Sequence, residues 1–369
     1  MRVLLLGTDA FSKGGIQRYT RYQYRALIEL LGEDNVFLFS LAGRDKENSW
    51  EEDIKVAYVG KGPSLFSKIC YVIRAIGFIK KNRISLLIST HVQLAIIGYL
   101  AKLIYGIPYY TNVYGLEIWS GLRKRDLVGL RHSDKLIGDC KFILNYVYDN
   151  LHFPAERSWL LYDPVDTARF APGKGKSELV KAAYGLPNGR RILLTVGRLD
   201  RNKGHHLVIR SLAFLRDDVI YVVVGGGIYL NALRDLAERE RVSNRVFFVG
   251  RVPDEDLVDF YNLSDIVILL SVFGKDEGEG LPLGLIEASA CGKPIICGNE
   301  DGSREAVEDG VNGVIVSPRV LEDLVGKLRD LLRDPEKLIE MGRIGRQKAV
   351  RDFSYVNFKQ EFSKIISGD

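Results

Sequence analysis

Short apolar runs alternate with stretches of helical spacing along the first half of the chain. Apolar runs of four to six residues bounded by turn residues are typical of buried parallel strands, and apolar residues at every third or fourth position are typical of helices. Strands are therefore expected at 3–6, 36–41, 84–89, 109–113 and 135–138, and helices at 16–31, 65–79 and 92–105. This order predicts an α/β fold with a parallel sheet covered by helices on both faces.

The same pattern restarts after residues 170–190, which are rich in proline and glycine and are predicted to be a linker. The expected strands are 192–196, 219–224, 245–249, 266–270 and 294–297, and the expected helices are 205–215, 230–240, 254–262 and 284–290. Two doubly wound domains in tandem are therefore predicted. Ligands of open parallel sheets bind at the carboxyl ends of the strands, so the cleft between the domains is the expected site.

The composition fits a soluble, two-domain protein. The chain has 369 residues, of which 46% are hydrophobic and 27% charged, as in ordinary globular proteins. No apolar run approaches the ~18 residues of a spanning helix, and the apolar start of the chain, 3–6, reads as the first strand of a cytoplasmic protein. The four cysteines form no C-x-x-C pair, so free thiols are expected.

Positive charge is concentrated in the first half. Residues 1–170 hold 23 basic and 17 acidic residues, whereas the remainder has a net charge of −1. Residues 54–116 contain eight basic residues and no acidic one. Such a one-sided patch indicates an anionic partner. A phospholipid surface or a lipid-phosphate substrate fits this modest charge better than a nucleic acid does.

Glycines and cations follow three of the predicted strands. Gly14-Gly15 precedes the first helix, where glycine lets a backbone N–H approach a phosphate. Arg198 and Lys203 follow the first strand of the second domain, where they could hold a phosphate. Gly225-Gly226-Gly227 follows the next strand, which suits either a planar ligand or a tight turn. Neither a dinucleotide fingerprint nor a P-loop occurs, which disfavours a nicotinamide oxidoreductase.

The segment 279–294 carries the most specific pattern. Glu279 lies on a Gly/Pro loop, and Glu287 follows eight residues later in the helix that this loop opens. Acids in an otherwise apolar segment are costly to bury and are expected to accept hydrogen bonds, such as those that sugar hydroxyls donate. The Gly280-Leu281-Pro282 turn at the helix start also offers free N–H donors to an anion.

This segment resembles the E-x7-E signature of retaining glycosyltransferases of family 4. The other pieces follow in the order that the family uses: Gly14-Gly15 with Gln17-Arg18, Gly197-Arg198 with Lys203-Gly204, Gly225-Gly226-Gly227, Val249-Gly250-Arg251-Val252, and Asp301-Gly302-Ser303-Arg304-Glu305 before Asn312-Gly313. The resemblance is close over roughly residues 190–345 and looser in the first domain.

The resemblance implies the GT-B architecture, with two Rossmann-like domains facing a central cleft. Residues 1–168 would form the acceptor-side domain and 169–348 the nucleotide-sugar domain. Residues 349–369 would form a helix that crosses back to the first domain. The aromatic helical spacing of 353–366 suits such a packed helix.

The family's donor-binding roles carry over by position. Arg198 and Lys203 would neutralise the donor diphosphate, Glu287 would bond the ribose hydroxyls, Glu279 would face the donor sugar, and Arg251-Val252 would lie by the base. Fixed cations stabilise the charge on the leaving diphosphate, so neither a metal nor a cofactor is expected. Further donor contacts are implied for Gly14, Gly15, Gly197, Gly225, Gly226, Gly280, Leu281, Pro282 and Leu283.

The chain departs from the family on the acceptor side. Relatives often have His-Gly-x-Glu where this sequence has Tyr114-Gly115-Leu116-Glu117. Tyrosine is not cationic at neutral pH, although Tyr114 could hydrogen-bond the sugar, and His91 is a second candidate for contact with the reacting sugar. The Asp254-Glu255-Asp256 motif has the D-x-D pattern of a metal site. It follows Pro253 at an expected helix start, however, where acidic side chains are stabilised by the helix dipole, so a metal site is not expected there.

The resemblance implies retaining transfer of a hexose from a UDP- or GDP-sugar to an acceptor hydroxyl on a glycan, lipid-linked glycan or small molecule. Front-face attack is implied, with the leaving phosphate helping to deprotonate the acceptor. A sugar-nucleotide epimerase or hydrolase, or a silent nucleotide-sugar-binding protein, stays open as an alternative. Residues 61–83 either bind an anionic membrane surface, making the protein peripheral at the inner face of the membrane, or pack on the sheet with solvated charges.

Overall fold

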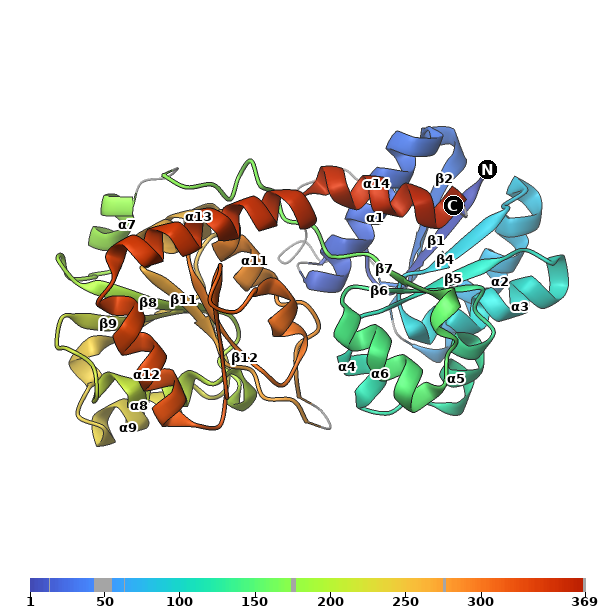
Figure 1. Cartoon of the computed structure of the whole chain (residues 1–369). Helices are drawn as coiled ribbons and strands as arrows, with labels where there is room; N and C mark the ends of the chain where they lie inside the picture. Colours follow the sequence, from blue (N-terminus) through green and yellow to red (C-terminus); the bar gives the residue numbers. More distant parts are fainter. Residues whose placement is uncertain (13, 43–54, 63, 174–176, 275–276, 368–369) are drawn as a thin grey trace. The chain divides into compact units, whose positions relative to one another are not determined.

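The computed structural model describes residues 1–12, 14–42, 55–62, 64–173, 177–274 and 277–367. The chain divides into two compact units. Unit 1 comprises Met1–Pro164 and Val356–Asp369, and unit 2 comprises Val165–Tyr355. Each unit is built on its own parallel sheet (Figure 1).

Unit 1 contains a seven-stranded sheet in the order β3-β2-β1-β4-β5-β6-β7. Each neighbouring pair is parallel. β1, β4 and β5 are buried along their whole length, as is typical of parallel strands covered on both faces. β1 is apolar throughout, whereas β5 buries Thr111 and Asn112, which hydrogen-bond to Ser133 and Gln23. The strands are β1 (Val3–Gly7), β2 (Val36–Ser40), β3 (Tyr58–Val59), β4 (Leu86–Ser89), β5 (Tyr109–Val113), β6 (Lys135–Gly138) and β7 (Ser158–Leu160).

Helices cover the sheet of unit 1. Among them, α2 packs on α3 and α3 packs on α5. The helices are α1 (Gly15–Leu31), α2 (Leu65–Asn82), α3 (Ala95–Tyr105), α4 (Leu116–Trp119), α5 (Lys124–Arg131), α6 (Lys141–Leu151) and α14 (Tyr355–Ser367). All but the first residue of α14 belongs to unit 1 although it ends the chain. Its Phe358 ring meets Tyr19 of α1 edge-on at 5.6 Å, and Lys359 pairs with Glu29 at 2.8 Å.

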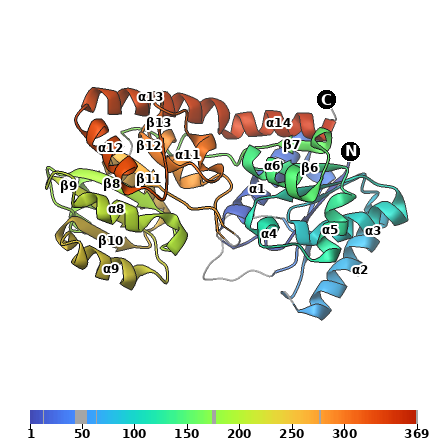
Figure 2. The ribbon, with the colours of Figure 1, turned by 60° about the horizontal axis from the view of Figure 1, so that its bottom comes forward.

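Unit 2 contains a six-stranded parallel sheet in the order β10-β9-β8-β11-β12-β13. In Figures 1 and 2, α8, α9 and α12 gather on one side of this sheet, and α11 and α13 lie on the other. The strands are β8 (Arg191–Val196), β9 (Val219–Val224), β10 (Val246–Gly250), β11 (Ile266–Leu269), β12 (Ile295–Gly298) and β13 (Gly313–Val316). The helices are α7 (Ser177–Ala183), α8 (His205–Leu212), α9 (Leu230–Arg239), α10 (Asp254–Leu263), α11 (Leu283–Ala290), α12 (Leu321–Leu332) and α13 (Pro335–Asp352).

Both sheets have the doubly wound strand order, so the predicted α/β fold class is confirmed. The order reverses between β1 and β4 in unit 1 and between β8 and β11 in unit 2. Ligands of such sheets bind outside the carboxyl ends of the strands at this switch point. A ligand site in unit 2 is therefore expected at the loops that follow β8 and β11.

Two local predictions were wrong. The predicted linker 170–190 contains helix α7, which packs against α10, because local apolar contacts outweigh the surrounding prolines and glycines. The predicted helix 92–105 begins instead as a 3-10 turn, Val92–Leu94, before α3. The expected start of α10 at Asp254, directly after Pro253, is confirmed, with three acids in its first turn.

Candidate functional site

The loop after β8 places two cations in different environments. Arg198 is exposed, and its guanidinium lies 3.1 Å from the Asp200 carboxylate. Lys203 ends a 3-10 turn, and its side chain is only 10% exposed. Burial, and then the positive charge of Arg198, lowers the pKa of Lys203 to about 8. A buried cation with a lowered pKa gains from a further anionic partner.

Lys203 forms an ion pair with Glu279, a residue 76 positions further along the chain. The two meet because β8 and β11 are neighbours in the sheet, so the loops that leave their carboxyl ends share one edge. The sequence predicts Lys203 on the diphosphate and Glu279 on the sugar as two separate groups. In the structure they neutralise each other, and a ligand at this edge would meet both.

Asp301 completes this cluster and was not predicted as a site residue. Its carboxylate accepts the backbone N–H of Glu279 at 2.9 Å and that of Ser303 at 3.0 Å. Burial raises the pKa of Asp301 to about 6, against the hydrogen bonds from Ser303 and the charge of Lys203. Asp301 therefore fixes the backbone beneath Glu279. Its position just after β12 was the sequence signal that could have indicated it.

His205 supports the loop that carries Arg198, and it was also not predicted as a site residue. Its ring is fully buried at the start of α8, where Nε2 donates to the Arg198 carbonyl at 3.2 Å. Nδ1 lies 2.8 Å from the Tyr221 hydroxyl, which lies 2.8 Å from the Thr195 hydroxyl. Burial lowers the pKa of His205 to about 4. The imidazole is thus neutral at physiological pH and acts as a brace for the loop.

Glu287 lies in α11 and is buried. Its Oε2 accepts a hydrogen bond from the fully buried Tyr261 hydroxyl at 2.8 Å. No sequence signal distinguished Tyr261, because it reads as an ordinary apolar position of α10. The carboxylate is thereby held in one orientation from inside unit 2.

The start of α11 is open to an anion. Pro282 occupies the N-cap position, and no side chain of the described residues caps the helix. The first N–H groups of a helix are not satisfied within it, so this end carries partial positive charge. In the turn that leads into this helix, Leu281 and Pro282 are buried, whereas Gly280 and Leu283 are partly exposed.

The predicted donor-site glycines Gly197, Gly225 and Gly226 differ in whether packing explains them. Gly225 has a φ of +137°, and a Cβ there would lie 1.8 Å from the Gly197 carbonyl, so backbone packing already requires a glycine. A Cβ on Gly197 itself would meet nothing within 4 Å. Packing therefore does not explain Gly197. A Cβ on Gly226 would approach only the Arg251 side chain, at 3.5 Å, and the adjacent Val252 is partly exposed.

In unit 1 the glycine pair lies at the start of α1, after the loop that leaves the carboxyl end of β1. Gly14 is the N-cap, and a Cβ there would meet the side chain of Gln17 at 2.3 Å. A Cβ on Gly15 would meet nothing within 4 Å. As with Gly197, the space beside Gly15 is open, and packing does not account for this glycine.

The two acceptor-side candidates are held by the backbone. The Tyr114 hydroxyl donates to the Thr90 carbonyl at 3.0 Å and accepts from the Asn112 amide at 3.1 Å. Its proton is therefore used inside unit 1, which favours a packing role over contact with a sugar. His91 caps the 3-10 turn after β4, accepting the N–H of Gln93 at Nδ1. Burial lowers the pKa of His91.

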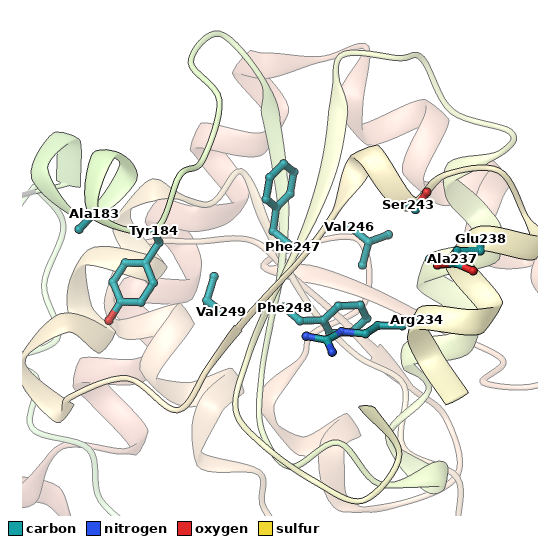
Figure 3. A pocket seen from close by; sticks show the side chains of 10 residues that line it. All are labelled: Ala183, Tyr184, Arg234, Ala237, Glu238, Ser243, Val246, Phe247, Phe248 and Val249. Atoms are coloured by element: carbon teal, nitrogen blue, oxygen red, sulfur yellow. The ribbon is translucent and has the colours of Figure 1, made fainter. Parts of the chain in front are cut away.

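A separate hollow of unit 2 contains none of the predicted donor residues. It has a volume of about 530 Å³ and lies along the edge strand β10, between Tyr184 on one side and Arg234 on the other (Figure 3). Within the described ranges, no three histidine, cysteine or carboxylate side chains gather as a metal site would need. Among the helices described, none combines the length and apolarity needed to cross a bilayer.

Comparisons with known proteins support a glycosyltransferase domain. Residues 176–348 match the model of the family "Glycosyl transferases group 1". A GDP-mannose-dependent alpha-(1-6)-phosphatidylinositol monomannoside mannosyltransferase of Mycolicibacterium smegmatis is 32% identical over 210 residues, which cover 55% of this chain and 54% of the relative. A D-inositol 3-phosphate glycosyltransferase of Corynebacterium jeikeium is 32% identical over 211 residues, covering 54% and 49%. The chain spans about half the length of these curated relatives.

The solved structures extend the likeness to the whole fold. Anabaena Alr3699/HepE in complex with UDP superposes with a TM-score of 0.84 at 19% identity, covering 100% of both chains. A sucrose-phosphate synthase from Thermosynechococcus elongatus has a TM-score of 0.83 at 18% identity, covering 100% of this chain and 99% of the other. At such identities the likeness shows the fold alone, which is that of GT-B glycosyltransferases.

Proposed function

We propose that this chain, whose residues 176–348 match the model of the glycosyl transferases group 1 family, transfers a hexose from a UDP- or GDP-sugar to an acceptor hydroxyl. The observation that carries the proposal is the meeting of Lys203 and Glu279 at the switch point of the unit 2 sheet. A cation and a carboxylate on adjacent loops suit a ligand that is both a diphosphate and a sugar.

The diphosphate is the part of the donor that needs fixed positive charge. In the proposed complex Arg198 and Lys203 bind it, and the uncapped start of α11 adds backbone N–H donors. The open space at Gly197 lets the backbone approach, and Gly15 of unit 1 contributes an N–H in the same way. These groups stabilise the leaving nucleoside diphosphate most when its charge develops, so the reaction proceeds without a metal ion or other cofactor.

The two glutamates bind hydroxyl groups in this proposal. Glu287, fixed by Tyr261, accepts from the ribose, and Glu279 faces the transferred sugar. The base lies beside Arg251-Val252, and the donor also contacts Gly225, Gly226 and the 280–283 turn. In the structure Glu279 is paired with Lys203. Donor binding therefore replaces this ion pair: Lys203 contacts the diphosphate and Glu279 contacts the sugar.

Unit 1 supplies the acceptor side, and a glycan, a lipid-linked glycan or a small molecule is the acceptor. His91 is the better candidate to contact the reacting sugar, because the Tyr114 hydroxyl is already bonded within unit 1. The resemblance to retaining glycosyltransferases is the basis for proposing that the transfer retains the anomeric configuration. Because no carboxylate is assigned as a covalent nucleophile, the proposed route to retention is front-face attack: the acceptor oxygen bonds to the anomeric carbon as the bond to the diphosphate breaks, and the leaving phosphate takes the acceptor proton.

Nucleotide selectivity is the first test, measured by thermal unfolding with UDP, GDP, ADP and NAD. At about 100 times the dissociation constant, a selective ligand stabilises the fold by roughly 2.7 kcal/mol. The relative named above as GDP-mannose-dependent makes GDP the first ligand to try, and the UDP-bound fold neighbour makes UDP the second. A shift with NAD alone, or no shift with either UDP or GDP, would refute the proposal.

A matched pair of variants locates the binding. Arg198→Ala should weaken nucleotide binding by roughly tenfold to a hundredfold, the value of a lost charge-assisted contact. Arg201→Ala, which removes an exposed arginine three residues away, should leave binding unchanged. Equal losses in both variants would indicate nonspecific attraction of the anion.

A turnover assay then distinguishes a glycosyltransferase from an epimerase, a hydrolase and a silent binding protein. Release of nucleoside diphosphate that requires an acceptor, and a product of unchanged anomeric configuration by NMR, supports a retaining transferase. Donor consumption without an acceptor indicates an epimerase or hydrolase. Binding without turnover of UDP-glucose or GDP-mannose across an acceptor panel indicates a silent binding protein.

A further inference from the structure

Helix α2 of unit 1 exposes apolar side chains on the side opposite to its packed face. Ser67, Tyr71, Ala75 and Ile79 are buried and follow one another at four-residue intervals. Leu65, Phe66, Ile69 and Ile73 are 74%, 74%, 49% and 66% exposed. At about 100° per residue these four fall within one stripe about 100° wide, centred roughly opposite the buried face. Packing on the sheet of unit 1 accounts for one face of α2 and leaves the other unexplained.

The charges around this stripe all have one sign. Within 61–83 the cations are Lys61, Lys68, Arg74, Lys80, Lys81 and Arg83, and residues 54–116 contain no acid. Within the part of the chain that the structure describes, none of these six cations forms an ion pair. Lys80 lies on the same side of α2 as the apolar stripe, since 15 residues separate it from Leu65, four turns and a small remainder.

We propose that the exposed face of α2 binds the surface of an anionic phospholipid bilayer. A helix with a stripe of large apolar residues and flanking cations lies in the plane of such an interface, with its apolar side chains among the acyl chains and its cations at the phosphates. The stripe from Leu65 to Lys80 is about 22 Å long, enough to lie flat on the surface. An apolar protein partner would satisfy the stripe but not the uncompensated positive charge.

This attachment goes beyond the proposed transfer reaction and does not depend on it. Helix α2 lies in unit 1, whereas the proposed donor residues lie in unit 2 and at Gly14-Gly15. Vesicle binding therefore tests the surface without any nucleotide or turnover, and failure of either proposal leaves the other standing.

The full chain should sediment with vesicles of phosphatidylcholine containing 30% phosphatidylglycerol at low salt, and far less with phosphatidylcholine alone. Phe66→Gln with Ile73→Gln should weaken binding by about tenfold or more, because two large side chains no longer enter the acyl region. The control pair Ile339→Gln with Val356→Gln removes side chains that are 73% and 72% exposed and should bind as the wild type does.

Charge is tested with a second matched pair. Lys80→Gln with Lys81→Gln should weaken binding by about fivefold per lysine at low salt, and Lys327→Gln with Lys337→Gln should not. Absence of binding to anionic vesicles would overturn the proposal, as would equal losses in the α2 and control variants. Self-association that Phe66→Gln with Ile73→Gln abolishes, without vesicle binding, would assign the stripe to a second copy of the chain instead.

Discussion

The hydrogen bond between Tyr261 and Glu287 offers a prediction that separates stability from donor binding. Tyr261→Phe removes only the hydroxyl, which lies 2.8 Å from the buried carboxylate. The ring stays packed edge-on to Phe170 at 5.9 Å, so no cavity of any size opens. Hydrogen bonds to charged groups contribute about 1.5–3 kcal/mol. We therefore expect the free energy of unfolding of unit 2 to fall by about 2 kcal/mol.

This loss is measurable as a shift in the melting temperature. For a unit of 150–250 residues, 1 kcal/mol corresponds to about 2–4 °C, so the expected decrease is roughly 4–8 °C. Glu287→Gln should cost less, because an amide oxygen can still accept from Tyr261. It should nevertheless weaken nucleotide binding, since the amide is a poorer acceptor for ribose hydroxyls.

Tyr184→Phe is the control for the Tyr261 variant. Its hydroxyl donates to Asp256 at 3.2 Å in a partly exposed site, so we expect a loss below about 0.5 kcal/mol. Urea unfolding should show the same order of stabilities with an unchanged m-value. Equal stabilities of Tyr261→Phe and wild type would refute the inference that this hydrogen bond orients Glu287.

Three further variants test other parts of unit 2. Arg245→Leu should lower the free energy of unfolding by about 3 kcal/mol or more in urea, because the buried guanidinium donates to three backbone carbonyls that would lose their partner. Gly225→Ala should cost more than about 2 kcal/mol by thermal unfolding, since its Cβ would lie 1.8 Å from the Gly197 carbonyl. Burial lowers the pKa of Lys203 to about 8, and an anion binds the charged lysine. Affinity for GDP or UDP, measured calorimetrically, should therefore fall by up to about tenfold per pH unit above 8. In Lys203→Met this fall should disappear, and a fall that persists would assign the titration to another group.

The positions of most strands could be predicted from the sequence. Strands buried on both faces are mostly apolar, and β9 and β11 show this directly. The glycines and cations after β1 and β8 were also visible, because strand ends and helix starts are local features. Helix α7 was not predicted, because it lies in the segment predicted to be a linker. The proline and glycine residues on either side of α7 outweighed the signal from the apolar residues that pack against α10.

What the sequence determined was therefore the α/β alternation, the doubly wound class and the residue types at the strand ends. Only the tertiary structure decided which of those residues meet. Lys203 and Glu279 pair because β8 and β11 are adjacent in the sheet, and Tyr261 reaches Glu287 from another helix. The Tyr114 hydroxyl turns inward to the Thr90 carbonyl. Periodicity reports the environment of each position along its own element, whereas these contacts depend on strand order and on side-chain direction, which no local pattern contains.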